Sequence, residues 1–191
     1  MRTLIVSDGP HELEGGALET LARRLAPKLT VCDHDRVSSP KVHTHRGKGK
    51  GYVKRTVAWL LEAKRRGYDA LVFVIDEDGD SDRPKQIDEA QESQFTSFPR
   101  AMGVAIRSFD AWILADESAL TSVLQQPIPR QPAPESIKNP KLVCTSLRDQ
   151  SGKDIALRDM YREVPQAANL AILEKRCPKG FAPFAARVRR L

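Results

Sequence analysis

Residues 70–75, Ala-Leu-Val-Phe-Val-Ile, form the clearest strand signal in the chain, since they are apolar throughout and rich in β-branched residues. Such a run favours a β-strand, and its continuous apolarity indicates burial on both faces. Strands buried on both faces occur mainly in parallel sheets that helices cover on each side. The chain is therefore expected to form an α/β fold around a parallel sheet.

Strand and helix patterns alternate around this run, which predicts βαβ units and a parallel sheet of about four strands flanked by helices. Residues 1–124 are assigned to this α/β domain. Residues 125–140 include five prolines and predict an extended connector. Residues 141–191 predict an α-helical C-terminal extension packed on the same domain. The predicted strands are 2–7, 29–32, 70–75 and 103–107. The predicted helices begin near residues 18, 53, 85 and 109, and the last of them extends to residue 124.

Composition narrows the class of protein. The 191 residues are 40% hydrophobic and 29% charged, as in globular domains. No apolar run approaches the roughly 20 residues of a membrane helix, and the N-terminus lacks the apolar core of a secretory signal. Cys32, Cys144 and Cys177 are too far apart for a Cys-x-x-Cys zinc site, and their odd number argues against a disulfide framework. We expect a cytoplasmic protein without membrane contact.

Acidic side chains follow three of the predicted strands. Asp8 and then Glu12 follow the first strand, residues 76–80 (Asp-Glu-Asp-Gly-Asp) follow the third, and Asp110 follows the fourth. Ligands of open parallel sheets bind beyond the carboxyl ends of the strands, and carboxylates that converge there need cations or protons to neutralise them. Oxygen-only ligation suits Mg²⁺ or Mn²⁺. The residues predicted to bind this metal are Asp8, Asp76, Asp78 and Asp80.

The acidic segment has three other interpretations. An EF-hand loop fails, because Ser81 or Arg83, depending on the starting residue, stands where its glycine belongs. A haloacid-dehalogenase-type phosphatase also has Asp-x-Asp after an apolar strand. In those phosphatases the motif follows the first strand, whereas in this chain it follows the third. The phosphatase motif also has other residues where Gly79 and Asp80 stand here. A solvated acidic turn stays open, although it does not explain Asp8 and Asp110.

Residues 43–52, His-Thr-His-Arg-Gly-Lys-Gly-Lys-Gly-Tyr, alternate glycine with lysine. Glycine permits close approach of a phosphate, which lysine neutralises, but the Gly-Lys-Ser/Thr ending of a P-loop is missing. The segment has two possible interpretations, a contact with a nucleic-acid backbone or a mobile surface loop. His43 and His45 likewise have two, as metal ligands or as solvent-exposed side chains. The predicted nucleic-acid-binding residues are Arg46, Lys48, Lys50, Lys54 and Lys153.

Residues 4–12 (Leu-Ile-Val-Ser-Asp-Gly-Pro-His-Glu) and 72–80 (Val-Phe-Val-Ile-Asp-Glu-Asp-Gly-Asp) resemble the motifs of the Toprim (topoisomerase–primase) fold. Residues 108–116 are similar to an acid-x-Trp-Leu-Leu-Ala-Asp segment. That segment recurs in a Toprim-like family of small bacterial proteins related to overcoming-lysogenization-defect-type nucleases. Residues 139–141 (Asn-Pro-Lys), together with Tyr161, Phe181 and Phe184, are similar to that family's helical tail.

The resemblance implies a Toprim/Rossmann-like fold and Mg²⁺- or Mn²⁺-dependent phosphoryl transfer on DNA or RNA, in the first place as a nuclease. By position it implies metal binding by Asp76 and Asp78 and catalytic roles for Asp8, Glu12 and Asp110. The family usually has Glu where Asp8 and Asp110 stand, and each Asp side chain is one methylene shorter. The resemblance further implies phage defence with an ATPase partner.

The alternative is a non-catalytic subunit that binds metal or nucleic acid. An apolar stripe through Phe181, Phe184, Ala185, Val188 and Leu191 suits docking to a partner or to a second copy, which would make a homo-oligomer.

Overall fold

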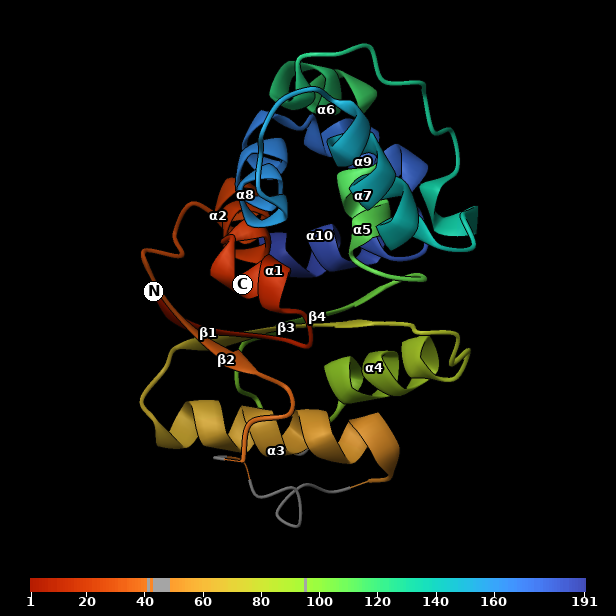
Figure 1. Ribbon diagram of the computed structural model, residues 1–191. Helices are drawn as coiled ribbons and strands as arrows, with labels where there is room; N and C mark the ends of the chain where they lie inside the picture. The colour runs from red at the N-terminus through yellow and green to blue at the C-terminus, as the bar shows by residue number, and fades with distance from the viewer. Residues whose placement is uncertain (41, 43–48, 95) are drawn as a thin grey trace.

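The computed structural model, which describes residues 1–40, 42, 49–94 and 96–191, confirms an α/β fold with an all-parallel sheet. Four strands pair in the order β2-β1-β3-β4, so the apolar strand β3 lies in the interior of the sheet (Figure 1). The strands are β1 (Arg2–Ser7), β2 (Val31–Arg36), β3 (Ala70–Asp76) and β4 (Arg100–Ala105).

Helices cover both faces of the sheet. One face carries α3 (Gly51–Arg65) and α4 (Arg83–Glu92), which pack on Leu4, Phe73 and Ile75 (Figure 1). The other face carries the larger layer, which includes the C-terminal helices. Its members are α1 (Pro10–Glu14), α2 (Ala17–Leu25), α5 (Asp110–Ile113), α6 (Glu117–Leu124), α7 (Pro140–Gln150), α8 (Leu157–Ala167), α9 (Leu170–Arg176) and α10 (Phe181–Arg189). In the described ranges, no helix is both long enough and apolar enough to span a membrane.

Three predicted boundaries differ from the structure. The strand expected at 29–32 lies at 31–36, because β2 is a polar edge strand in which Asp33 and Asp35 form ion pairs with Arg2 and Arg66. The strand expected at 103–107 lies at 100–105. The helix expected at 109–124 is interrupted at Asp116, whose side chain accepts hydrogen bonds from the amides of Ser118 and Ala119 and so starts a new helix.

The connector expected at 125–140 contains one short 3₁₀ turn, η2 (Pro134–Ser136). Its buried Glu135 accepts hydrogen bonds from the amides of Lys179 (3.1 Å) and Gly180 (2.6 Å). Glu135 therefore fixes the connector to the loop between α9 and α10.

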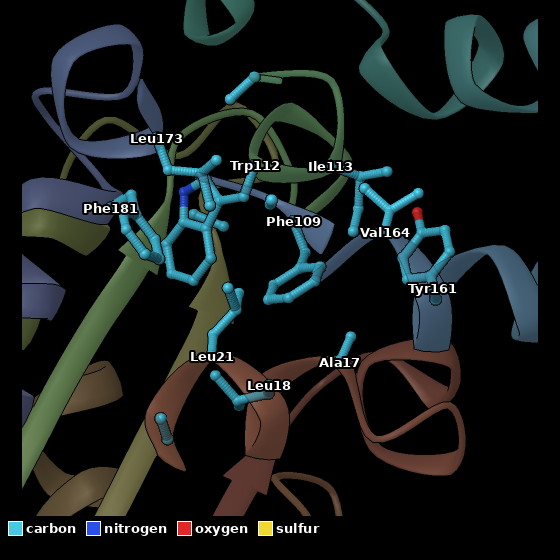
Figure 2. Close-up of a cluster of buried hydrophobic side chains, with 14 of the residues drawn as sticks. Ala17, Leu18, Leu21, Phe109, Trp112, Ile113, Tyr161, Val164, Leu173 and Phe181 are labelled. Atoms are coloured by element: carbon cyan, nitrogen blue, oxygen red, sulfur yellow. The ribbon is translucent and has the colours of Figure 1, made fainter. Parts of the chain in front are cut away.

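The apolar stripe of α10 lies inside the molecule. Phe181, Phe184, Ala185 and Val188 are fully buried, and α10 packs against β4. Figure 2 shows Phe181 in a cluster with Trp112, whose ring centroid lies 5.2 Å away. The docking interpretation of these four residues is therefore wrong, because the protein's own sheet already covers them.

Replacing Gly103 by Ala is expected to destabilise this contact. A Cβ at residue 103 would lie 2.9 Å from Cδ2 of Phe184, which is closer than packed carbon atoms approach. Overpacking of this kind costs about 1–3 kcal/mol. Urea denaturation should show this loss, and Phe184→Leu made in the Gly103→Ala protein should cost less than it does in the wild type. An unchanged free energy of unfolding in Gly103→Ala would contradict the packing described.

Candidate active site at the carboxyl edge of the sheet

A cleft of about 530 Å³ opens where β1, β3 and β4 end. The sequence elements that reach it are far apart in the chain, and the C-terminal layer forms one of its walls. Its lining residues are Gly9, Pro10, His11, Glu12, Asp76, Asp78, Gly79, Arg107, Ser108, Asp110, Lys138, Asn139, Pro140, Lys141 and Tyr161. The cleft thus lies where the sequence predicted a site.

Glu12 lies in the short helix α1, which begins directly after β1 because Gly9 and Pro10 turn the chain. Its side chain is only 6% exposed and accepts hydrogen bonds from the Ser7 hydroxyl and from the Gly9 amide (3.3 Å). Burial, assisted by the charges of Asp110 and Asp8, raises the pKa of Glu12 to about 7 against the lowering effect of these hydrogen bonds. Glu12 is therefore a carboxyl group poised to change protonation near neutral pH.

Asp76 is the last residue of β3 and is half-buried. Its Oδ1 atom accepts a hydrogen bond of 2.8 Å from the amide of Phe109, which connects the ends of β3 and β4. Burial raises the pKa of Asp76 to about 8, and the charge of Glu12 is the next largest cause. Asp76 and Glu12 are therefore electrostatic neighbours that resist being charged together.

Asp110 starts α5 and is also 6% exposed. Its Oδ2 atom accepts a hydrogen bond of 2.9 Å from the Ser108 hydroxyl, and its Oδ1 atom accepts one from the Tyr161 hydroxyl. The structure thus brings together four of the predicted acids, Glu12, Asp76, Asp78 and Asp110, in the lining of one cleft.

The acidic turn after β3 is partly neutralised by Arg83. Asp78 has a positive φ of 50°, lines the cleft and pairs with Nη1 of Arg83 at 2.9 Å. Asp80 is exposed and lies 3.6 Å from Nε of the same arginine. Burial raises the pKa of Asp8, while the charges of Arg83 and Arg55 lower it. Neither Asp8 nor Asp80 is among the residues that line the cleft.

Three basic side chains that the sequence analysis did not predict as site residues, Arg107, Lys138 and Lys141, also line the cleft and are exposed. Within the described ranges they form no ion pair with the carboxylates beside them. The cleft therefore has an acidic base and separate cationic side chains around it.

The predicted nucleic-acid-binding residues lie elsewhere. Lys50 is the residue before α3, Lys54 lies within that helix, and the ammonium group of Lys153 donates a hydrogen bond of 2.8 Å to the Val123 carbonyl. None of these three lines the cleft. The remaining members of the predicted basic segment, His43, His45, Arg46 and Lys48, fall outside the described residues.

The donors in the cleft suit a hard divalent cation, because carboxylate oxygens are the ligands that Mg²⁺ and Mn²⁺ prefer. The part of the chain that the structure describes holds no group of three or more His, Cys, Asp or Glu side chains arranged to bind a metal. Mg²⁺ usually keeps several waters and binds through one or two carboxylates, so it does not need such a group. The buried Glu12 and the half-buried Asp76, both with raised pKa values, are compatible with this mode of binding.

Arg83 and Tyr161 contribute contacts that the sequence did not reveal. Arg83 contacts three aspartates that precede it by three to seven residues, and this spacing is a signal that the sequence offers. Tyr161 lies 51 residues after Asp110, and no local pattern connects the two.

The function of the site is inferred from this geometry and from the short motifs quoted above, because comparison with protein-family models, curated proteins and solved structures found no match.

Proposed function

We propose that the cleft binds Mg²⁺ or Mn²⁺ and hydrolyses phosphodiester bonds of DNA or RNA. The observation that supports this most is the pair Glu12 and Asp76, two carboxyl groups withdrawn from water beside each other. Neither forms an ion pair with a Lys or Arg of the described chain. Such a pair requires a proton or a cation at neutral pH, and a bound metal ion would supply the cation.

The cationic side chains of the cleft support a polyanionic substrate. Arg107, Lys138 and Lys141 lie beside the carboxylates without neutralising them, which leaves them free to contact phosphate oxygens. Lys50 and Lys54 at the start of α3 add positive charge on the other helical layer. Lysine and arginine contacts to phosphates supply most of the sequence-independent affinity for nucleic acids.

Different side chains of the cleft are proposed to bind the metal and to accept the proton. A divalent cation, when bound, would polarise a phosphate oxygen and lower the pKa of an attacking water. Asp76 and Asp78 are the residues proposed to hold it, and Asp110, whose charge acts on Asp76, is proposed to hold a water molecule bound to the cation. Glu12 is the better proton acceptor than Asp8, because it lines the cleft and its pKa of about 7 allows it to take up and return a proton near neutral pH. Ser7 and Gly9 orient the Glu12 carboxylate through the two hydrogen bonds that it accepts.

A cleavage assay tests this function. Wild-type protein with Mn²⁺ or Mg²⁺ should cut labelled single-stranded or double-stranded oligonucleotides of DNA or RNA. The Asp76→Asn/Asp78→Asn protein should lose at least about 100-fold in rate, because removal of metal ligands abolishes the electrostatic stabilisation of the reacting phosphate. The matched control is Asp82→Asn, which removes an exposed carboxylate of the same segment outside the cleft and should cut at the wild-type rate. Equal cleavage by all three proteins would indicate a contaminating nuclease and contradict the proposal.

A second candidate is a non-catalytic subunit that binds nucleic acid or metal, for instance beside an ATPase in phage defence. It is favoured by Asp8 and Asp110, which stand where the resembled family usually has the longer Glu, and by Arg83, which already neutralises Asp78. Oligonucleotide binding by the wild type without cleavage in either metal would support this candidate over the nuclease.

A further inference from the structure

We propose that Tyr161 is a positioning residue for Asp110, so that the C-terminal helix α8 completes the active site. This inference rests on the proposed metal-dependent function and concerns a residue that neither touches the substrate nor binds the metal. It acts through the carboxylate that its hydroxyl group contacts.

The two oxygens of Asp110 have different hydroxyl donors. Tyr161 donates to Oδ1 and Ser108 donates to Oδ2. A carboxylate held by one donor can still rotate about its Cβ–Cγ bond, whereas one donor on each oxygen fixes its plane. Hydrogen bonds to a charged acceptor are also among the stronger ones in proteins. Asp110 is therefore held in one orientation at the base of the cleft.

The position of Tyr161 is itself fixed by packing. The residue is 3% exposed and belongs with Ile113 and Val164 to the buried cluster of Figure 2. Its ring stacks on that of Phe109 at a centroid distance of 6.2 Å. A phenylalanine at this position would make the same apolar contacts. Packing alone therefore does not explain the hydroxyl group of Tyr161.

Tyr161 also connects Asp110 to the helix that carries Glu12. Its ring lies 5.6 Å from that of His11 in α1. A Cβ placed on Gly15, directly after α1, would lie 2.9 Å from the Arg158 carbonyl and 3.3 Å from Cβ of Tyr161, so α1 and α8 are in close contact. One buried side chain thus contacts both the carboxylate of Asp110 and the helix that carries Glu12.

The test compares Tyr161→Phe with Tyr68→Phe. Tyr68 is a matched control because it is also buried and its hydroxyl group also contacts a carboxylate, that of Asp33. It differs in position, since it precedes β3 and so lies at the amino end of that strand, away from the cleft. Two quantities are measured: the ¹³Cγ resonance of Asp110, assigned by its absence in Asp110→Asn, and the Kd for Mn²⁺ from calorimetry. Unfolding curves of both Phe variants show whether each is folded.

We expect Tyr161→Phe to shift the Asp110 resonance and to weaken Mn²⁺ binding by about 10-fold, the lower end of what loss of an outer-shell hydrogen bond costs at metal sites. Tyr68→Phe should leave both quantities unchanged. An unshifted resonance, or a shifted resonance with wild-type Mn²⁺ affinity, would overturn the positioning role. If the wild type itself binds no Mn²⁺, the proposed metal-dependent function fails first, and the positioning role fails with it.

Discussion

Asp76→Asn is expected to lose Mn²⁺ binding by at least about 100-fold and, in the absence of metal, to be more stable than the wild type at pH 8. The two effects have one cause. The wild-type carboxyl group is withdrawn from water beside Glu12, and burial raises its pKa to about 8. Ionising it in the metal-free protein costs free energy that the amide of Asn does not, so stability should rise by a few kcal/mol, with an upper limit of about 5 kcal/mol for a shift of about four pKa units.

The substitution is conservative for the fold. The amide oxygen of Asn can accept the 2.8 Å hydrogen bond from Phe109 that the Oδ1 atom of Asp76 accepts now. Calorimetry with Mn²⁺ and urea denaturation in EDTA measure the two effects, and Asp82→Asn serves as control for a carboxylate outside the cleft. Loss of Mn²⁺ binding together with lower stability would show that Asp76 has a structural role. Full Mn²⁺ binding would remove Asp76 from the metal site.

The sheet was predictable because its central strand has a strong local signal. Residues 70–75 are apolar at every position and rich in β-branched residues, which favours a strand covered on both faces, and β3 does lie in the interior of the sheet. β2 was misplaced because the sequence Cys-Asp-His-Asp-Arg has no apolar periodicity. Its stability comes from pairing with β1 and from ion pairs with Arg2 and Arg66, which are tertiary contacts.

The acids of the cleft were predictable for a related reason. Asp76 and Asp110 follow predicted strands of one parallel sheet and Glu12 follows another within a turn, so topology brings them to the same edge. The partners of these acids were not predictable. Tyr161 and the cationic residues Lys138 and Lys141 line the cleft and belong to the C-terminal part of the chain, whose helices pack on β4 and on the helices that follow β1 and β4. That placement depends on packing among distant segments.

Stability in the absence of metal should fall as the pH rises from about 5 to about 8. Glu12 and Asp76 have folded-state pKa values of about 7 and 8, above the unfolded values of about 4. The folded protein therefore binds more protons than the unfolded chain between these limits. The stabilisation that these groups provide is fully present below about pH 4 and is lost as the pH rises through the folded values. Burial raises the pKa of Glu135 as well, which adds an effect of the same sign.

The opposite effect operates at lower pH. Salt-bridged acids such as Glu117 and Glu174 have lowered pKa values, and their contribution is lost only as the pH falls toward those values. The window from about pH 5 to 8 also ends below the pKa of about 8.5 of the thiols in the unfolded chain, so their contribution is small. Within it, the two buried carboxyl groups dominate. The expected loss is of the order of 3 kcal/mol, less than the sum of the two shifts because protonation of one group relieves the other.

Urea denaturation in EDTA at about pH 5, 6.5 and 8 measures this loss, and the Glu12→Gln/Asp76→Asn protein is the control whose stability should change much less over the same range. Under the proposed function a divalent cation would replace the missing protons, so Mg²⁺ should stabilise the wild type most at pH 8 and least at pH 5. A wild type whose stability in EDTA is flat across this window would show that the two carboxyl groups are not held together in a desolvated cleft. A pH-dependent stability that Mg²⁺ leaves unchanged would keep the buried pair but remove the metal, so the two claims are tested separately.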